Sequence, residues 1–330
     1  MTAGPTLVIQ TAFLGDVVLT TPLLSALAEQ FGPVDVVTTP GAAALLEGHP
    51  AVRAVVPHDK HRSERGIGGI FRLAKRLRAE GYQRAYLPHR SWRSGMAALL
   101  AGIPERIGFE HAPARWSYTR RVPRDPTLHE VPRLLALADA PDRYPLSLGI
   151  STTDDASAAA WLDLAGVPEQ FVALAPGSIW GTKRWGKFPE LAAALDTFVV
   201  TVGGPEDRAL GESVVAAAKS GGVNAAGQLP LRVSAALLGR ATALVSNDSA
   251  PMHMAQAMGT PVVALFGPTV PSFGFAPRGP EDVVLEVDGL NCRPCSSHGP
   301  RVCPLGHHHC MTELELVRVL AALEPLLSPA

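Results

Sequence analysis

The chain has 330 residues, which is too long for one ordinary hydrophobic core and predicts two domains. Hydrophobic residues make up 47% and charged residues 18%, which excludes a disordered chain, and a net charge of −1 argues against a nucleic-acid partner. No apolar run reaches the roughly 18 residues of a membrane span. The N-terminal sequence shows no signal peptide, so we expect a cytoplasmic protein.

The charge is unevenly distributed along the chain. Residues 1–150 contain 18 Lys and Arg against 13 Asp and Glu, whereas residues 151–330 contain 11 against 17. Most of the basic excess lies between Lys60 and Arg124. Two interpretations stay open: a solvated Arg-rich face, or a site for a phosphate or carboxylate partner, which Arg binds with two parallel hydrogen bonds.

Short apolar runs alternate with helical patterns in the first half of the chain. The predicted strands cover residues 7–13, 34–39, 51–58, 84–89 and 106–109. The predicted helices between them cover residues 23–31, 42–48, 70–81 and 94–102. This alternation predicts a parallel sheet with right-handed crossovers.

The second half repeats the pattern. Its predicted strands cover residues 171–178, 197–204, 243–248 and 261–268, and its predicted helices cover 188–195, 231–241, 250–259 and 312–327. We therefore expect an α/β protein with two Rossmann-like parallel-sheet domains that face each other across a cleft, with the ligand at the carboxyl ends of the strands. The predicted domains are 1–155 and 156–330, and the second contains a Cys-rich segment, residues 291–311, before the last helix.

Several common motifs are missing. No G-x-G-x-x-G follows the first strand, which disfavours a dinucleotide oxidoreductase, and the loop GSIWGTK does not have the Walker spacing. The sequence also contains no H-E-x-x-H and no G-x-S-x-G.

A first polar loop, FLGDVVLTTPLL, follows the first predicted strand. Asp16 in this loop is either a helix N-cap or a general base for a substrate hydroxyl. Pro22 suits the first turn of a helix that is capped by Thr21, which would leave Asp16 in the loop.

Two further polar loops follow strands of the second half. In APGSIWGTKRWGK, Ser178 and Lys183 offer donors for a phosphate, and Trp180 and Trp185 either flank a sugar or base or are half-buried surface residues. In VSNDSAPMHMAQAMG, the residues Asp248, Ser249 and His253 surround the start of a helix whose free N–H groups suit a diphosphate. A lone His on a helix is also compatible with a purely structural role.

The motifs together resemble the ADP-heptose:lipopolysaccharide heptosyltransferases, glycosyltransferase family nine. The matching stretches are GDVVLTTPLL, LPHRSWRSGMAALLAGIPERIGF, PGSIWGTKRW and SNDSAPMHMAQAMGTPVVALFGPT, in the expected order over nearly the whole chain. The segment CxPC…CPLGH…C is similar to that of heptosyltransferase-II-like members.

The resemblance implies a GT-B fold and an inverting, metal-independent transferase that moves a heptose from ADP-heptose to the inner core of lipopolysaccharide. It implies an anionic lipid-linked saccharide as acceptor, bound by the N-terminal domain. Because that acceptor is a lipid, the basic stretch from Arg72 to Arg78 is either a contact with the anionic surface of the inner membrane or an ordinary amphipathic helix with a basic face. The implied catalytic base is Asp16. The implied donor-binding residues are Lys183, Glu206 (with Asp207 as an alternative), Asp248, His253 and a backbone contact at Ser249 or Ala250, and we add Ser178 from the hydroxyl that its loop offers. For the anionic groups of the acceptor we select Arg90 and Arg93.

Other functions stay open at this point. They are a same-family transferase with another sugar or acceptor, a GT-B nucleotide-sugar 2-epimerase, and a nucleotide-sugar-binding protein without catalysis. No catalytic cofactor is expected. The cysteines Cys292, Cys295, Cys303 and Cys310 have the spacing C-x2-C-x7-C-x6-C, which suggests either a structural zinc site or reduced thiols that bind no metal.

Overall fold

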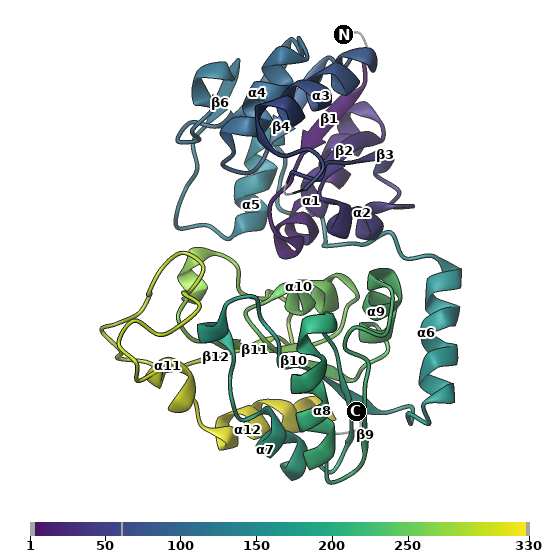
Figure 1. Cartoon of the computed structure of the whole chain (residues 1–330), viewed down its shortest axis with the longest axis vertical. Coiled ribbons are helices and arrows are strands. Elements are labelled where there is room, and N and C mark those ends of the chain that lie inside the picture. The colour runs from purple at the N-terminus through teal and green to yellow at the C-terminus, as the bar shows by residue number, and fades with distance from the viewer. Residues whose placement is uncertain (1–3, 61, 328–330) are drawn as a thin grey trace. The chain divides into compact units, whose positions relative to one another are not determined.

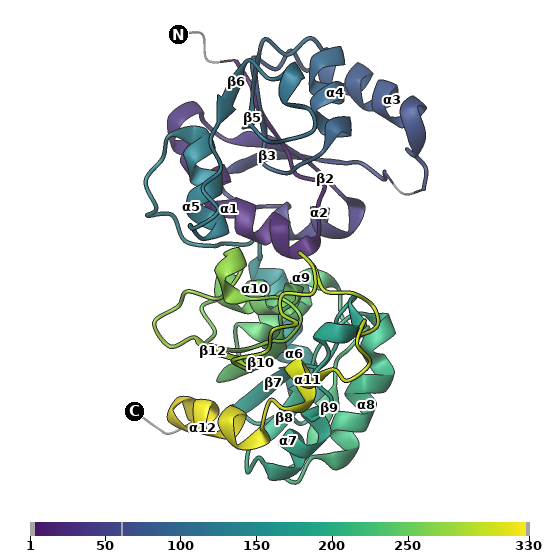
Figure 2. The same cartoon turned by 90° about the vertical axis from the view of Figure 1, so that its left-hand side faces the viewer.

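The computed structural model describes residues 4–60 and 62–327, and the chain divides into two compact units, Met1–Gly149 and Ile150–Ala330. Each unit contains one six-stranded parallel sheet that is flanked by helices (Figures 1 and 2). The predicted α/β class with two Rossmann-like sheets is therefore confirmed.

The sheet of the N-terminal unit has the strand order β3-β2-β1-β4-β5-β6. Its strands are β1 (Thr6–Ile9), β2 (Val34–Thr38), β3 (Val52–Pro57), β4 (Arg84–Leu87), β5 (Glu105–Phe109) and β6 (Arg120–Val122). Its helices are α1 (Leu14–Phe31), α2 (Pro40–Leu46), α3 (Gly66–Ala79), α4 (Trp92–Leu100) and α5 (Glu130–Leu135).

The sheet of the C-terminal unit has the order β12-β11-β10-β7-β8-β9. Its strands are β7 (Phe171–Ala175), β8 (Phe198–Thr201), β9 (Gly222–Asn224), β10 (Ala243–Asn247), β11 (Val262–Phe266) and β12 (Val283–Glu286). Its helices are α6 (Thr152–Leu164), α7 (Phe188–Ala194), α8 (Arg208–Ala217), α9 (Leu231–Leu238), α10 (Ala250–Ala257), α11 (His309–Thr312) and α12 (Leu316–Leu327).

Both units place the first strand in sequence beside the fourth. Leu7 of β1 is in register with Ala85 of β4, and Ala173 of β7 is in register with Leu244 of β10. The strands that follow the first one in sequence are added on one side of it, and the later strands are added on the other side, beginning with the fourth. Parallel sheets bind their ligands at the carboxyl ends of the two strands where this change of side occurs. The three polar loops singled out in the sequence follow β1, β7 and β10, and the selected residue Arg90 follows β4, so all of them lie at these positions.

The central strands are buried because both faces of each sheet are covered. Every residue of β1, β7, β10 and β11 is buried, and these strands are continuous runs of apolar residues with few polar members. The rigid strand ends therefore give the polar loops a fixed base.

The predicted start of the first helix was wrong. Helix α1 begins at Leu14 instead of after Thr21, so Asp16 lies in its first turn and Pro22 lies inside it. Proline cannot donate a backbone hydrogen bond to the carbonyl four residues earlier, that of Val18. The Thr21 hydroxyl donates to this oxygen instead, at 2.8 Å, which lets the helix continue through Pro22.

Candidate functional site

Asp16 lies at the start of α1, directly after the carboxyl end of β1. Its Oδ2 accepts a hydrogen bond of 3.0 Å from the backbone N–H of Phe13, and the residue is half-buried. The N-cap of α1 is Phe13 and Asp16 is the third residue of the helix, so the predicted N-cap role of Asp16 was wrong, and its carboxylate instead accepts from the N–H of the N-cap residue. Because this bond uses one of several lone pairs, it leaves the carboxylate able to accept a further proton or hydrogen bond.

Sequence reasoning did not identify two nitrogen-bearing side chains of the N-terminal unit, Lys60 and His89, that influence each other electrostatically. Lys60 Nζ donates to the backbone oxygen of Thr11 at 2.5 Å. Burial lowers the pKa of Lys60, Arg93 lowers it further, and the carboxylate of Asp16 opposes both. The one available signal was compositional, because the sequence contains only five lysines.

His89, just beyond β4, is the second of these side chains. Burial lowers its pKa to about 4, so the ring is neutral at pH 7. Its Nδ1 donates to the carbonyl of Ile9 at 3.1 Å, so Nε2 is the acceptor that faces the hydroxyls of Thr11 (3.2 Å) and Ser94 (3.3 Å). His89 thus ties the end of β1 to the start of α4.

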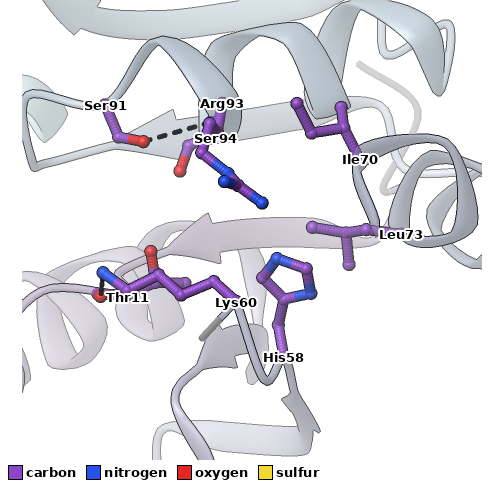
Figure 3. A pocket seen from close by; sticks show the side chains of 8 residues that line it. All are labelled: Thr11, His58, Lys60, Ile70, Leu73, Ser91, Arg93 and Ser94. Atoms are coloured by element: carbon purple, nitrogen blue, oxygen red, sulfur yellow. Dashed lines mark hydrogen bonds between the residues drawn. The ribbon is translucent and has the colours of Figure 1, made fainter. Parts of the chain in front are cut away.

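A narrow pocket lies beside these residues (Figure 3). It is lined by Thr11, His58, Lys60, Ile70, Leu73, Ser91, Arg93 and Ser94. Arg93 donates to the backbone oxygen of Gly66 at 3.2 Å, while its Nε is buried without a hydrogen-bond partner among the described residues. The predicted residue Arg90 is exposed and is not among the lining residues. The pocket therefore combines an ammonium and a guanidinium with hydroxyl groups, a set of donors that suits an anion.

In the C-terminal unit, the two predicted polar loops meet at one ion pair. Lys183 Nζ lies 2.5 Å from Asp248 Oδ2, and the same oxygen accepts a hydrogen bond of 2.7 Å from the hydroxyl of Thr269. Both charged residues are buried, Lys183 with 8% of its surface exposed and Asp248 with 9%. Thr269 was missed as a site residue, although it follows the predicted apolar strand that ends in FGP.

The helix after Asp248 begins as predicted. Ser249 is its N-cap and Ala250 its first residue, which places the free N–H groups of α10 beside the ion pair. His253 is buried, and its Nδ1 makes no hydrogen bond with the part of the chain that the structure describes. Burial lowers the pKa of His253 to about 4, Asp248 opposes this and Lys183 reinforces it. The ring is therefore neutral at pH 7.

Two acidic neighbours after β8 differ sharply in their surroundings. Glu206 is exposed, whereas Asp207 is buried and accepts a hydrogen bond of 3.0 Å from the backbone N–H of Gly204. Burial raises the pKa of Asp207. A Cβ on Gly177 would lie 2.1 Å from the Asp207 carboxylate, so only glycine fits the close approach of these two loops. Glu206 is thus the acidic side chain of the pair that a ligand can reach.

Asn247, at the end of β10, makes hydrogen bonds with two parts of the loop that follows β7. Its Nδ2 donates to the oxygen of Pro176 at 2.9 Å, and its Oδ1 accepts from the backbone N–H of Trp185 at 3.0 Å. This clamp fixes the segment that carries Ser178, whose hydroxyl accepts from the backbone N–H of Trp180 at 3.3 Å. A sugar-flanking role for Trp185 was wrong, because the ring is 2% exposed and packs in the core with its N–H on the oxygen of Leu314.

The Cys-rich segment lies against the loop that carries Lys183. The ring of Trp180 stacks on that of His298, with centroids 6.1 Å apart, and His308 Nε2 lies 2.6 Å from the oxygen of Thr182. The hydroxyl of Thr182 also donates to the oxygen of Pro300. Although far away in sequence, the segment therefore supports the residue that precedes Lys183.

The four cysteines are all free thiols, and Cys310 is buried in the core of the C-terminal unit. Within residues 4–60 and 62–327, no group of three or more His, Cys, Asp or Glu side chains is placed to hold a metal ion. Burial raises the pKa of Cys310 to about 11, whereas backbone N–H groups of residues 305–308 overcome burial and lower the pKa of Cys303. The thiols as placed do not form a zinc site.

Two Rossmann-like units, each with polar side chains at the carboxyl ends of the strands where its sheet reverses direction, form the architecture of the GT-B class of glycosyltransferases. The chain belongs to glycosyltransferase family 9 (heptosyltransferase), whose sequence model matches residues 70–305. The resemblance stated from the motifs is thereby confirmed.

Relatives of known name and structure agree with this family. The chain is 28% identical to lipopolysaccharide heptosyltransferase 2 of Salmonella typhimurium, with 98% of each chain covered, and 29% identical to the Escherichia coli K12 protein of that name, with 81% and 84% covered. It superimposes on the structure of E. coli ADP-heptose LPS heptosyltransferase II with a TM-score of 0.81 at 26% identity, covering 98% of each chain. A family 9 structure from Veillonella parvula shares the fold, with a TM-score of 0.87 at 24% identity, covering 99% of this chain and 98% of that one.

Proposed function

We propose that this chain transfers a heptose from ADP-heptose to the inner core of lipopolysaccharide, with inversion at the anomeric carbon. The names of the relatives support the choice of donor and acceptor. The observation that carries the chemistry is the buried group of Lys183, Asp248 and Thr269 at the start of α10, a set of donors and a helix terminus suited to a diphosphate.

Asp16 acts as the general base in this proposal. A hydroxyl of the acceptor forms a bond to the anomeric carbon while the bond from that carbon to the diphosphate oxygen breaks, and the hydroxyl proton passes to Asp16. The electron pair of the broken bond leaves with ADP. General-base catalysis of this kind contributes about 10²–10⁴-fold in rate.

Lys183, Ser178 and the N–H groups at the start of α10, after Ser249 and Ala250, stabilise the charge that develops on ADP. Asp248 holds the Lys183 ammonium in place through their contact of 2.5 Å. His253, on the first turns of α10, contacts the donor as a neutral ring, and exposed Glu206 binds the ribose hydroxyls. This arrangement stabilises the leaving group without a metal ion.

Arg93 and Lys60 bind an anionic group of the acceptor in the pocket of Figure 3, and exposed Arg90 contacts a second group outside it. The protein acts at the cytoplasmic face of the inner membrane, where such an acceptor is anchored. Among the described helices, none combines the length and apolar character needed to cross a bilayer. The association is therefore proposed as peripheral.

A structural zinc on Cys292, Cys295, Cys303 and Cys310 stays a proposal of its own. It requires the thiols to move together from their described positions. Metal analysis of untagged protein tests it, and an absence of stoichiometric metal contradicts it.

The variant Asp16→Asn tests the proposed reaction. We expect transfer from ADP-heptose to fall by about 10²–10⁴-fold while ADP binding, measured by calorimetry, stays unchanged. Asp163→Asn, at an exposed position on α6, is the control and should retain full turnover. Near-normal turnover by Asp16→Asn would refute the assignment of the base, and product formed without any acceptor would refute the transferase.

A further inference from the structure

The outward face of α3 combines exposed apolar side chains with basic ones. The inward face is apolar, with Ile70, Leu73 and Leu77 buried against the sheet. On the outward face, Ile67 and Phe71 expose 67% and 57% of their surfaces. The positions i and i+4 place these two side chains next to each other on the helix surface.

Basic residues surround this apolar pair. Within the described chain, no carboxylate forms an ion pair with Arg62, Arg65, Arg72 or Lys75, whereas Arg76 is paired with Glu64 at 3.0 Å. Arg72 spends one donor on a backbone oxygen, that of Ser63, and so keeps its full charge. The face is therefore cationic as well as apolar.

The neighbouring helix α4 adds a further exposed apolar side chain to this region. Helix α4 packs beside α3 on the N-terminal sheet (Figures 1 and 2), and it begins at Trp92, which is exposed. An aromatic ring at the rim of a basic helix face is suited to the boundary between lipid head groups and acyl chains. A soluble acidic partner accounts for the basic charge but not for the exposed Ile67 and Phe71.

We infer that the outward face of α3 docks on a lipid surface with anionic head groups, with Phe71 and Ile67 inserted at the level of the head groups and with Arg72 and Lys75 near the phosphates. This inference deepens the proposed function, since it supplies the face by which the transferase approaches a membrane-anchored acceptor. Binding to lipid needs no substrate, so the two proposals are tested separately.

The experiment is co-sedimentation of the full chain with vesicles of phosphatidylglycerol and phosphatidylcholine, and with vesicles of phosphatidylcholine alone. We expect binding to the anionic vesicles that weakens as salt is raised. Arg72→Gln with Lys75→Gln should weaken it about 25-fold, because each basic residue near such a surface contributes about fivefold. Phe71→Ser should weaken it about tenfold or more through the loss of apolar insertion.

Matched controls lie on the C-terminal unit. Arg318 is exposed and donates to a backbone oxygen, as Arg72 does, and Leu164 is an exposed apolar residue on α6. Arg318→Gln and Leu164→Ser should bind vesicles as the unaltered chain does. Equal binding to neutral vesicles, or unaltered binding by the α3 variants, would overturn the inference.

Two further measurements separate the remaining explanations. Self-association in sedimentation velocity that disappears in Phe71→Ser would overturn the inference in favour of a second copy of the chain on this face. Transfer to an acceptor stripped of its acyl chains should be unaffected by the α3 variants. If that transfer is absent from the unaltered chain while vesicle binding persists, the proposed function fails and the docking surface stands.

Discussion

The buried ion pair between Lys183 and Asp248 makes a quantitative prediction about stability. Replacement of Lys183 by Met keeps the length of the side chain but leaves a buried carboxylate whose remaining hydrogen-bond donor, within the described residues, is the Thr269 hydroxyl. Removing one partner of a buried pair costs about 3–5 kcal/mol. Because Thr269 still donates, we expect Lys183→Met to lower the free energy of unfolding by about 3 kcal/mol.

The chain provides a matched control for this change. Lys219 and Asp196 form an ion pair of the same residue types with a similar distance, 2.6 Å between Nζ and Oδ1, but both side chains are exposed. Exposed pairs contribute less than about 1 kcal/mol, so Lys219→Met should be nearly neutral. The difference between the two variants therefore measures the effect of burial on one kind of contact.

The assay is urea unfolding followed by tryptophan fluorescence and circular dichroism, with the two units fitted as separate transitions. The double variant Lys183→Met with Asp248→Asn should recover about 2 kcal/mol, since a neutral amide needs no cation. If Lys183→Met is no less stable than Lys219→Met, or if the two changes at the pair are simply additive, the ion pair is not coupled as its geometry indicates.

Three other predictions concern the residues that position the site. Gly177→Ala should destabilise the C-terminal unit by about 1–3 kcal/mol in the same assay, because its Cβ would meet Asp207 at 2.1 Å, and Gly186→Ala, which has open space, should not. Asn247→Ala should cost about 1–3 kcal/mol through two unsatisfied backbone groups and should weaken ADP binding in calorimetry; unchanged ADP binding would show that the clamp does not shape the site. His89 and His253, with pKa values of about 4 in the folded chain, bind fewer protons than they do when unfolded, so stability is retained above pH 6.5 and falls as the pH drops from 6.5 to 4. Each of the two histidines changes the free energy of unfolding by up to about 1.4 kcal/mol per pH unit in this range. His89→Gln should therefore reduce the slope of unfolding free energy against pH by up to that amount.

The central strands were predictable because they are apolar on both faces. β7, β10 and β11 each fall inside a predicted strand, and β1 overlaps one at Leu7–Ile9; all four have a core of Val, Leu, Ile or Ala that no helix period explains. The edge strands β6, β9 and β12 were not predicted. β6 (Arg-Arg-Val) and β9 (Gly-Val-Asn) have only three residues each and contain no apolar run. They are recognised as strands only because they pair with a neighbouring strand.

The position of Asp16 illustrates how a local signal is overridden. Pro22 is a good helix-starting residue by its own geometry, and that expectation put the helix boundary eight residues too late. The helix instead continues through Pro22, because the Thr21 hydroxyl donates to the carbonyl of Val18, to which proline has no N–H to donate. No scale of single-residue propensities contains this pairwise compensation, so the sequence indicated Asp16 as a site residue without indicating its place in the first turn of α1.

The Cys-rich segment shows a limit of a different kind. Nothing in the sequence indicates that it contacts the loop of Lys183, yet the carbonyl of Thr182 accepts from His308 and the hydroxyl of Thr182 donates to the oxygen of Pro300. Because a carbonyl only accepts, Nε2 of His308 must carry the proton, which fixes the tautomer of that ring. Lys183 is the next residue, and its ammonium must reach Asp248 from a backbone held by these two bonds. The position of Lys183 therefore depends on two contacts that the Cys-rich segment makes with the preceding residue, Thr182.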